Sequence, residues 1–118
     1  MWHTAPEIQV IDNAYKGGLQ PAQMAGANYD LHAPAKDVAM SPGQWIAMRV
    51  VARGNRVEHW LNDVKIVEYE IGSADWERRV QASKFKQYPG YGRARRGHIG
   101  LQDHGDGVAY RNIRIRPL

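Results

Sequence analysis

Apolar and polar residues alternate over short stretches of this chain, and no long stretch keeps a helical period. Glu7–Asp12 begins with such an alternation, which is typical of a strand with one buried face. The strongest strand signals, rich in β-branched and aromatic residues, are Gln44–Arg53, Val57–Leu61 and Val64–Glu70. The dipeptides Gly54-Asn55 and Asn62-Asp63 separate these three segments and suit tight turns, so the pattern predicts two successive hairpins.

Glycines, prolines and a capping residue predict the remaining elements. Asn28–His32 is a further strand signal, and residues 97–105 and 108–115 predict two C-terminal strands. Glycines interrupt the first of these two, which in a strand indicates a bulge or the close approach of a ligand. One short helix is expected over Ser73–Ser83, whose first serine suits an N-cap. We therefore predict a single all-β domain over residues 1–118, an antiparallel sandwich or part of one, with one short helix.

Composition excludes several classes of protein. The 118 residues include no cysteine, which excludes a disulfide-stapled mini-protein and a zinc site built on thiolates. No apolar run approaches the roughly 18 residues of a membrane span, so no membrane partner is predicted. Met1–Pro6 lacks the basic start and apolar stretch of a signal peptide, and the localisation stays open. The histidines show no metal-ligand spacing, so no transition metal or other cofactor is predicted, whereas calcium stays open because carbonyl ligands leave no sequence trace.

The net charge of +4 suggests a nucleic-acid partner, but its distribution argues against one. Residues 1–92 carry ten basic and ten acidic side chains, whereas residues 93–118 carry six arginines and two aspartates. The excess is confined to two small groups in the C-terminal part of the chain. A solvated face is the commoner cause of such charge, so no nucleic-acid binding is predicted.

Glu7, Gln9 and Asp12 form the first candidate site. Residues i and i+2 of a strand point the same way, and residue i+5 joins that face only where a bulge intervenes. Two carboxyl groups and an amide on one concave surface suit acid–base chemistry on sugars. The spacing is that of the Glu-x-Asp-x-x-Glu motif of laminarinase-type glycosidases, with Gln9 and Asp12 replacing the second and third carboxylates. The alternative is an edge strand whose polar side chains face water.

Two further groups of residues are candidates. Gln102, Asp103 and His104 precede a glycine, and an aspartate beside a histidine suits an oriented general base. His59 and Trp60 alternate on a strand, so one of them faces a groove and the other the core. The loop around residue 88 is rich in aromatics, and tyrosine rings pack well on sugar faces. Its candidate sugar-binding residues are Lys84, Tyr88 and Tyr91.

Taken in order, seven blocks of the sequence resemble the 3-keto-disaccharide hydrolase domain, a family formerly of unknown function and associated with glycosyl hydrolases. The resemblance covers nearly the whole chain, and the Leu-Gln-Asp-His-Gly block followed by Arg-Asn-Ile is its most specific part. The blocks are Glu7–Asn13, Tyr29–Pro34, Pro42–Trp45, Gly54–Asn62, Ser83–Phe85, Gly97–Gly105 and Tyr110–Ile115.

The resemblance implies a concanavalin A-like lectin/glucanase sandwich of jelly-roll type with a sugar-binding groove, and cleavage of 3-keto-glycosides through loss of the C2 proton. It implies a carbohydrate ligand and no cofactor. The catalytic positions it implies are Glu7, Asp103 and His104, with His104 or Glu7 moving the proton and Asp103 orienting the imidazole. The substrate-binding positions it implies are Gln9, Asp12, His59, Lys84 and Gln102, to which the aromatic loop adds Tyr88 and Tyr91.

The family pattern has strands before the Glu-x-Gln strand, including an Asn-Ser-Gly-x-x-x-Arg segment, that this sequence lacks. An interior strand without its neighbours exposes an unpaired edge, so a homodimer that completes the sandwich is expected. A non-catalytic carbohydrate-binding or interaction module derived from the same family is the alternative function.

Overall fold

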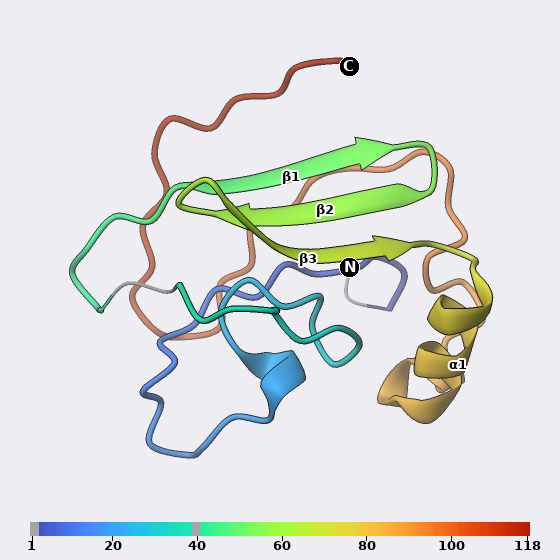
Figure 1. The fold of residues 1–118 in the computed structure, drawn as a ribbon, viewed down its shortest axis with the longest axis horizontal. Helices are drawn as coiled ribbons and strands as arrows, with labels where there is room; N and C mark the ends of the chain where they lie inside the picture. Colours follow the sequence, from blue (N-terminus) through green and yellow to red (C-terminus); the bar gives the residue numbers. More distant parts are fainter. Residues whose placement is uncertain (1–2, 39–40) are drawn as a thin grey trace.

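The computed structural model describes residues 3–38 and 41–118 and contains one antiparallel sheet. Its strands are β1 (Met48–Arg53), β2 (Arg56–Leu61) and β3 (Val64–Glu70), which lie side by side in that order (Figure 1). Gly54, Asn62 and Asp63 have positive φ values of 59°, 46° and 61°, as tight hairpin turns require. The two predicted hairpins are confirmed.

A bulge in β3 increases the apolar surface that the sheet buries. His59 pairs with Val67 and Trp60 pairs with Lys65, so Ile66 has no partner of its own across the strand pair. Ile66 and Val67 are consecutive and would face opposite sides of a regular strand, yet both are buried. The extra residue thus adds one apolar side chain to the core.

The predicted helix forms as α1 (Ala74–Ala82), which lies at one end of the sheet (Figure 1). The Ser73 hydroxyl accepts a hydrogen bond from the Trp76 amide at 3.1 Å, which is an N-cap. Trp76 and Val80, one turn apart, are the buried residues of the helix. Two short 3-10 helices, η1 (Pro21–Gln23) and η2 (Lys84–Gln87), complete the regular elements of the described residues.

A column of stacked rings joins the helix to the sheet. The ring of Trp76 stacks between Tyr69 of β3 and Tyr91, with centroid distances of 5.5 and 5.7 Å. His32 stacks on Tyr69 at 5.0 Å, and Phe85 stacks on Tyr91 at 4.1 Å. The column therefore brings four separate parts of the chain into one core.

Two N-terminal strand predictions change in the structure. Glu7–Asp12 keeps only an isolated bridge, which joins Ile8 to Asn28. Asn28–His32 is a tight turn rather than a strand, because the amides of Leu31 and His32 both donate to the carbonyl of Asn28. Asp30 in this turn has a φ of 63°, which a strand does not accommodate.

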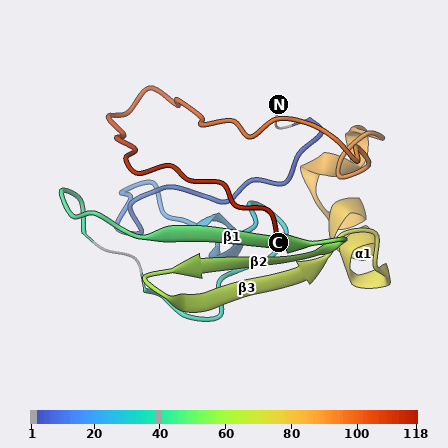
Figure 2. The ribbon, with the colours of Figure 1, turned by 90° about the horizontal axis from the view of Figure 1, so that it is seen from above.

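The two predicted C-terminal strands do not form. Residues 94–118 run outside the sheet as an irregular trace, orange to red in Figures 1 and 2. Within the parts of the chain that the structure describes, the backbone of this segment has no hydrogen-bonded strand beside it. Side chains that alternate along it, such as Ile99 and Ile115, are each 76% exposed. The structure thus shows one antiparallel sheet with a helix, and the second sheet of a sandwich is not formed.

Side-chain contacts attach this C-terminal segment to the sheet. The Arg111 guanidinium lies 3.9 Å from the centre of the Trp45 ring, and Arg95 donates a 2.7 Å hydrogen bond to the Asn55 side chain. No helix in residues 3–38 or 41–118 is long and apolar enough to cross a bilayer.

Candidate functional site

Glu7 lies on an extended segment that is paired with residues 26–29. The Tyr29 amide donates to the Glu7 carbonyl at 2.9 Å, and the Gln9 amide donates to the Ala27 carbonyl at 3.0 Å. The Gly26 amide donates to the Gln9 carbonyl at 2.8 Å. The side chains of Glu7 and Gln9 are both half-buried. The backbone of the first candidate site is therefore held at three points.

Gly26 connects this segment to the core of the sheet. A Cβ atom at Gly26 would lie 2.2 Å from Ile66 Cδ1 and 2.8 Å from Leu61 Cδ1, and its φ is +80°. Only glycine allows so close an approach in this conformation. The Gly26 carbonyl accepts a hydrogen bond from His59 Nδ1 at 2.9 Å. Residues of β2 and β3 thereby fix the position of Gly26, and the hydrogen bond from Gly26 to Gln9 fixes the neighbouring Glu7 segment.

Glu7 is a half-buried carboxyl group whose surroundings shift its pKa. Partial burial raises its pKa above the ordinary value of 4.5, while the nearby charges of Lys84 and His104 act in the opposite direction. The structure thus brings together three of the predicted site residues, from three separate segments. A half-buried carboxyl group with a raised pKa near a lysine and a histidine is suited to taking and returning a proton.

Lys84 extends from the start of η2 over aromatic rings. Its Nζ lies 4.5 Å from the centre of the Tyr29 ring and 5.4 Å from that of Phe85. The Phe85 amide donates to the Ser83 hydroxyl at 3.1 Å, which fixes the backbone where the lysine begins. The Lys84 side chain is therefore a cation at a defined place beside Glu7.

His104, Asp103 and Gln102 are exposed on the C-terminal segment. The Asp103 carboxylate accepts a 2.8 Å hydrogen bond from the Gly105 amide, which closes a local turn. Among the residues that the structure describes, no hydrogen bond joins Asp103 to His104. Asp103 therefore does not orient the imidazole of His104 in this conformation. His104 is nevertheless close enough to Glu7 to lower the pKa of its carboxyl group.

Gln9 and Asp12 separate from one another. Gln9 lines a hollow of about 50 Å³, which is otherwise mostly apolar and includes Gln44 and Ile46. Asp12 is exposed, and its carboxylate accepts a 2.9 Å hydrogen bond from the Ala14 amide. A turn follows directly after Asp12, whose backbone carbonyl accepts a hydrogen bond from the Tyr15 amide at 3.0 Å.

His59 is a core residue. Its Nδ1 donates to the Gly26 carbonyl, and its Nε2 therefore accepts from the Tyr69 hydroxyl at 3.3 Å. Burial lowers its pKa, so the ring is neutral. Of the two orientations left open by the sequence, the structure places His59 inside and leaves Trp60 partly exposed. His59 is therefore a buried residue that stabilises the backbone at Gly26, the partner of the Glu7 segment, and does not face the solvent.

The two tyrosines predicted to contact a sugar differ in exposure. Tyr88 is half-buried and stacks on His3 at 4.2 Å. Tyr91 is 2% exposed, with Trp76 on one face and Phe85 on the other. Because both faces of the Tyr91 ring are covered, the ring is not available for stacking on a sugar, and that expectation is corrected.

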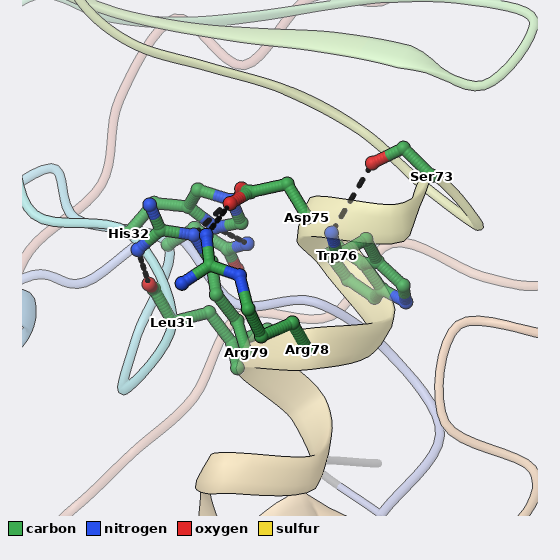
Figure 3. A network of polar contacts seen from close by, with 8 residues as sticks. Leu31, His32, Ser73, Asp75, Trp76, Arg78 and Arg79 are labelled. Atoms are coloured by element: carbon green, nitrogen blue, oxygen red, sulfur yellow. Dashed lines mark hydrogen bonds and ion pairs between the residues drawn. The ribbon is translucent and has the colours of Figure 1, made fainter.

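A polar network next to His32 fixes the turn that carries Tyr29 (Figure 3). Arg79 donates to the Leu31 carbonyl at 2.8 Å and to the Asp75 carboxylate at 2.7 Å. The Asn28 side chain donates to His32 Nδ1 at 3.0 Å, and His32 Nε2 lies 3.5 Å from Asp75. Burial and the Arg79 charge lower the pKa of His32 to about 4, against the opposing effect of Asp75.

Sequence reasoning missed two residues of this site, Tyr29 and Asp30. Both lie in a segment whose pattern predicts a strand. The segment is a turn instead, and this turn places the Tyr29 ring under the Lys84 ammonium. The only local signal is that aspartate, like asparagine, tolerates a positive φ, which favours a turn at this position. Within residues 3–38 and 41–118, no three His, Asp or Glu side chains come close enough to hold a metal ion.

The chain is similar in fold to a glycosyl hydrolase-like structure. The crystal structure of a candidate glycosyl hydrolase from Parabacteroides distasonis matches with a TM-score of 0.70 and 33% identity, over 79% of this chain and 45% of that chain. A 3-keto-disaccharide hydrolase from Bacteroides thetaiotaomicron is 33% identical over an alignment that covers 98% of this chain and 44% of the relative.

A family model described as the 3-keto-alpha-glucoside-1,2-lyase-like domain matches residues 1–116. The chain belongs to this family, and the resemblance found in the sequence is confirmed. It spans less than half the length of the two relatives described above.

Proposed function

We propose that this chain carries the proton-transfer residues of a domain that cleaves 3-keto-glycosides. The observation that supports the proposal most directly is the half-buried Glu7 carboxyl group, which lies in the fields of Lys84 and His104. Membership of the 3-keto-alpha-glucoside-1,2-lyase-like family and similarity to a 3-keto-disaccharide hydrolase support the same substrate class.

A ketone at C3 of a sugar makes the C2 proton acidic. A base removes this proton, the electron pair forms the C1–C2 double bond, and the C1–O glycosidic bond breaks with the pair going to oxygen. The departing oxygen takes up a proton to leave as an alcohol, and water then adds to the unsaturated sugar. This route needs one base and one group that stabilises negative charge, but no second carboxylate as nucleophile.

The geometry supports Glu7 as the base and Lys84 as the group beside the developing enolate oxygen. Glu7 is held through its backbone, and partial burial raises its pKa, which strengthens it as a base. His104 is exposed and is the proposed donor to the leaving oxygen. Gln9 and Gln102 are proposed to bind sugar hydroxyl groups.

Mass spectrometry of reactions with 3-keto-trehalose and 3-keto-lactose tests this function. We expect Glu7→Gln to lower turnover by at least about 100-fold, in the range for loss of a general base. Asp12→Asn is the matched control, since Asp12 lies in a separate turn. Absence of cleavage by the wild-type chain, or full turnover by Glu7→Gln, would contradict the proposal.

A sugar-binding module without catalysis is the second candidate. The observation that favours it is the exposed position of Gln102–His104 on a segment that has no strand partner among the described residues. In this case the wild-type chain and Glu7→Gln would both give saturable chemical-shift changes with trehalose, and neither would produce cleavage products from the keto sugars.

We also propose that residues 97–105 and 108–115 form strands of a concanavalin A-like sandwich when a second copy of the chain pairs with them. Alternating apolar side chains along both segments support this, since Ile99, Leu101, Ile113 and Ile115 are all exposed. The outer edge of β1 is also unpaired, and Val50 on that strand is exposed.

Light scattering after size-exclusion chromatography tests the second copy. We expect a dimer for the wild-type chain and a monomer for the Ile113→Asp/Ile115→Asp variant. Arg114→Gln, which changes the residue between them on the opposite face, should leave the dimer intact. A wild-type chain that is monomeric at all concentrations would exclude this assembly.

A further inference from the structure

The site contains one aromatic ring that is not among the site residues predicted from the sequence. Tyr29 lies directly beneath the Lys84 ammonium, with 4.5 Å between Nζ and the ring centre. A cation at this distance from an aromatic face is attracted by the negative charge of the ring face. A lysine side chain is otherwise flexible, with four rotatable bonds, so such a contact narrows the positions that its charge adopts.

Backbone hydrogen bonds hold Tyr29 next to the Glu7 segment. Its amide donates to the Glu7 carbonyl at 2.9 Å, and the next amide, that of Asp30, donates to Ala22 at 2.9 Å. The ring is partly buried against the hydrophobic core. One residue therefore contacts the Glu7 segment through its backbone and Lys84 through its side chain.

Phe85 limits the lysine from a second direction. Its ring is 2% exposed and lies 5.4 Å from Lys84 Nζ. Because Phe85 and Lys84 are adjacent in η2, the stem of the lysine starts at a point that the core fixes. Tyr29 adds a contact at the outer end of the same side chain, where its ring lies under the ammonium group.

We propose that Tyr29 is a positioning residue, whose ring holds the Lys84 ammonium beside the Glu7 carboxyl group. The role of this pair in cleaving 3-keto-glycosides rests on the proposed function above, but the position of the cation does not. Tyr29 itself moves no proton in this proposal. It keeps the charge of Lys84 where an enolate oxygen forms next to the base.

Two other titratable groups are electrostatically coupled to Glu7, and their effects must be separated from that of Lys84. His104 contributes from the C-terminal segment, which has no strand partner among the described residues. Tyr91 is buried, and the charge of Glu7 contributes to raising its pKa. Lys84 is the group whose charge lies over the Tyr29 ring, so a change at Tyr29 acts on its position directly.

Nuclear magnetic resonance of the full chain tests the position of the cation without requiring turnover. In the wild-type chain we expect the ε protons of Lys84 to be shifted upfield relative to those of Lys36, because they lie over a ring. Tyr29→Phe keeps the ring and should retain this shift. Tyr29→Leu should lose it, and the carboxyl pKa of Glu7 should rise because the nearby positive charge disperses.

Val64→Ala is the packing control, since Val64, the first residue of β3, is partly buried against the same core. It should alter stability but neither the Lys84 shift nor the Glu7 titration. If Tyr29→Leu does not fold, pentafluorophenylalanine at position 29 keeps the shape of the ring, reverses the charge of its face, and should raise the Glu7 pKa in the same way.

Turnover of 3-keto-trehalose then separates the two proposals. We expect kcat to fall by about tenfold in Tyr29→Leu and to stay near the wild-type value in Tyr29→Phe. Absence of an upfield Lys84 shift in the wild-type chain, or an unchanged Glu7 pKa in both ring-altering variants, would overturn the positioning role. Normal magnetic resonance results without any turnover would refute the catalytic function and leave the positioning role standing.

Discussion

Burial of Glu7 opposes its ionisation, which links the site to stability. Because its folded-state pKa is raised above 4.5, the folded chain holds this proton more tightly than the unfolded chain does. Stability from this group is full below pH 4.5 and is lost as the pH rises through the folded pKa. We expect Glu7→Gln to increase the free energy of unfolding at pH 7 while it abolishes turnover, as measured by urea denaturation.

The pH dependence of turnover provides a second test at Glu7. A base acts only when it is deprotonated, so kcat/KM should fall on the acid side with an apparent pKa above 4.5. The profile of Lys84→Met should move this limb to higher pH, since the positive charge of Lys84 lowers the Glu7 pKa. An unmoved limb would show that another group controls the acid side.

Protonation of the buried His32 should lower the free energy of unfolding in acid. Its pKa falls from 6.5 in the unfolded chain to about 4 in the folded chain, because burial disfavours the charged ring. The unfolded state therefore binds more protons between these values, and stability falls as the pH drops from 6.5 towards 4, by at most about 3 kcal/mol. Thermal unfolding of His32→Gln should show a weaker dependence over this range, with the remainder arising from His59 and carboxyl groups.

At the scale of elements, Gly26 should be the glycine least tolerant of change. Gly26→Ala forces a Cβ atom to within 2.2 Å of Ile66 and adds backbone strain at φ +80°. We expect a loss of about 3 kcal/mol in urea denaturation. Gly72 has nearly the same φ, +81°, with open space around it, so Gly72→Ala should cost only about 1 kcal/mol. Equal losses would show that strain alone matters.

The sequence predicts those elements whose signals are local. The hairpins follow from turn residues that lie between strand formers, and α1 follows from Ser73 and the apolar residues one turn apart. The carboxylate of Asp12 closes the next turn, a contact that strand spacing does not predict. The burial of Tyr91 could not be predicted, since it depends on Trp76 and Phe85 from other elements.

At the scale of the whole molecule, the C-terminal segment is where alternation and structure disagree. Residues 97–105 and 108–115 have the pattern of strands, but a strand needs a neighbour for its backbone hydrogen bonds, and the described chain provides none beside them. Sequence periodicity reports which face of a segment is apolar. It does not report whether another strand is present to cover that face.

Limited trypsin digestion tests the state of this segment. At low protein concentration we expect the first cuts after Arg95, Arg96, Arg111 or Arg114, while Arg79, which is bonded to Leu31 and Asp75, stays protected. If a second copy pairs with the segment, these cuts should slow as the concentration rises. Mass spectrometry of the fragments distinguishes the two patterns, and early cleavage after Arg79 would contradict the structure.

The stacked rings around Trp76 provide a spectroscopic signal of tertiary packing. Trp76 is held nearly parallel to Tyr69 and Tyr91, with angles of 20° and 12° between the planes. Ordered aromatic neighbours of this kind give a strong circular dichroism signal in the near ultraviolet, which vanishes when packing loosens. Because His32 stacks on both Tyr69 and Trp76, and Phe85 beside Lys84 stacks on Tyr91, this one signal monitors both the acid-sensitive network and the surroundings of Lys84.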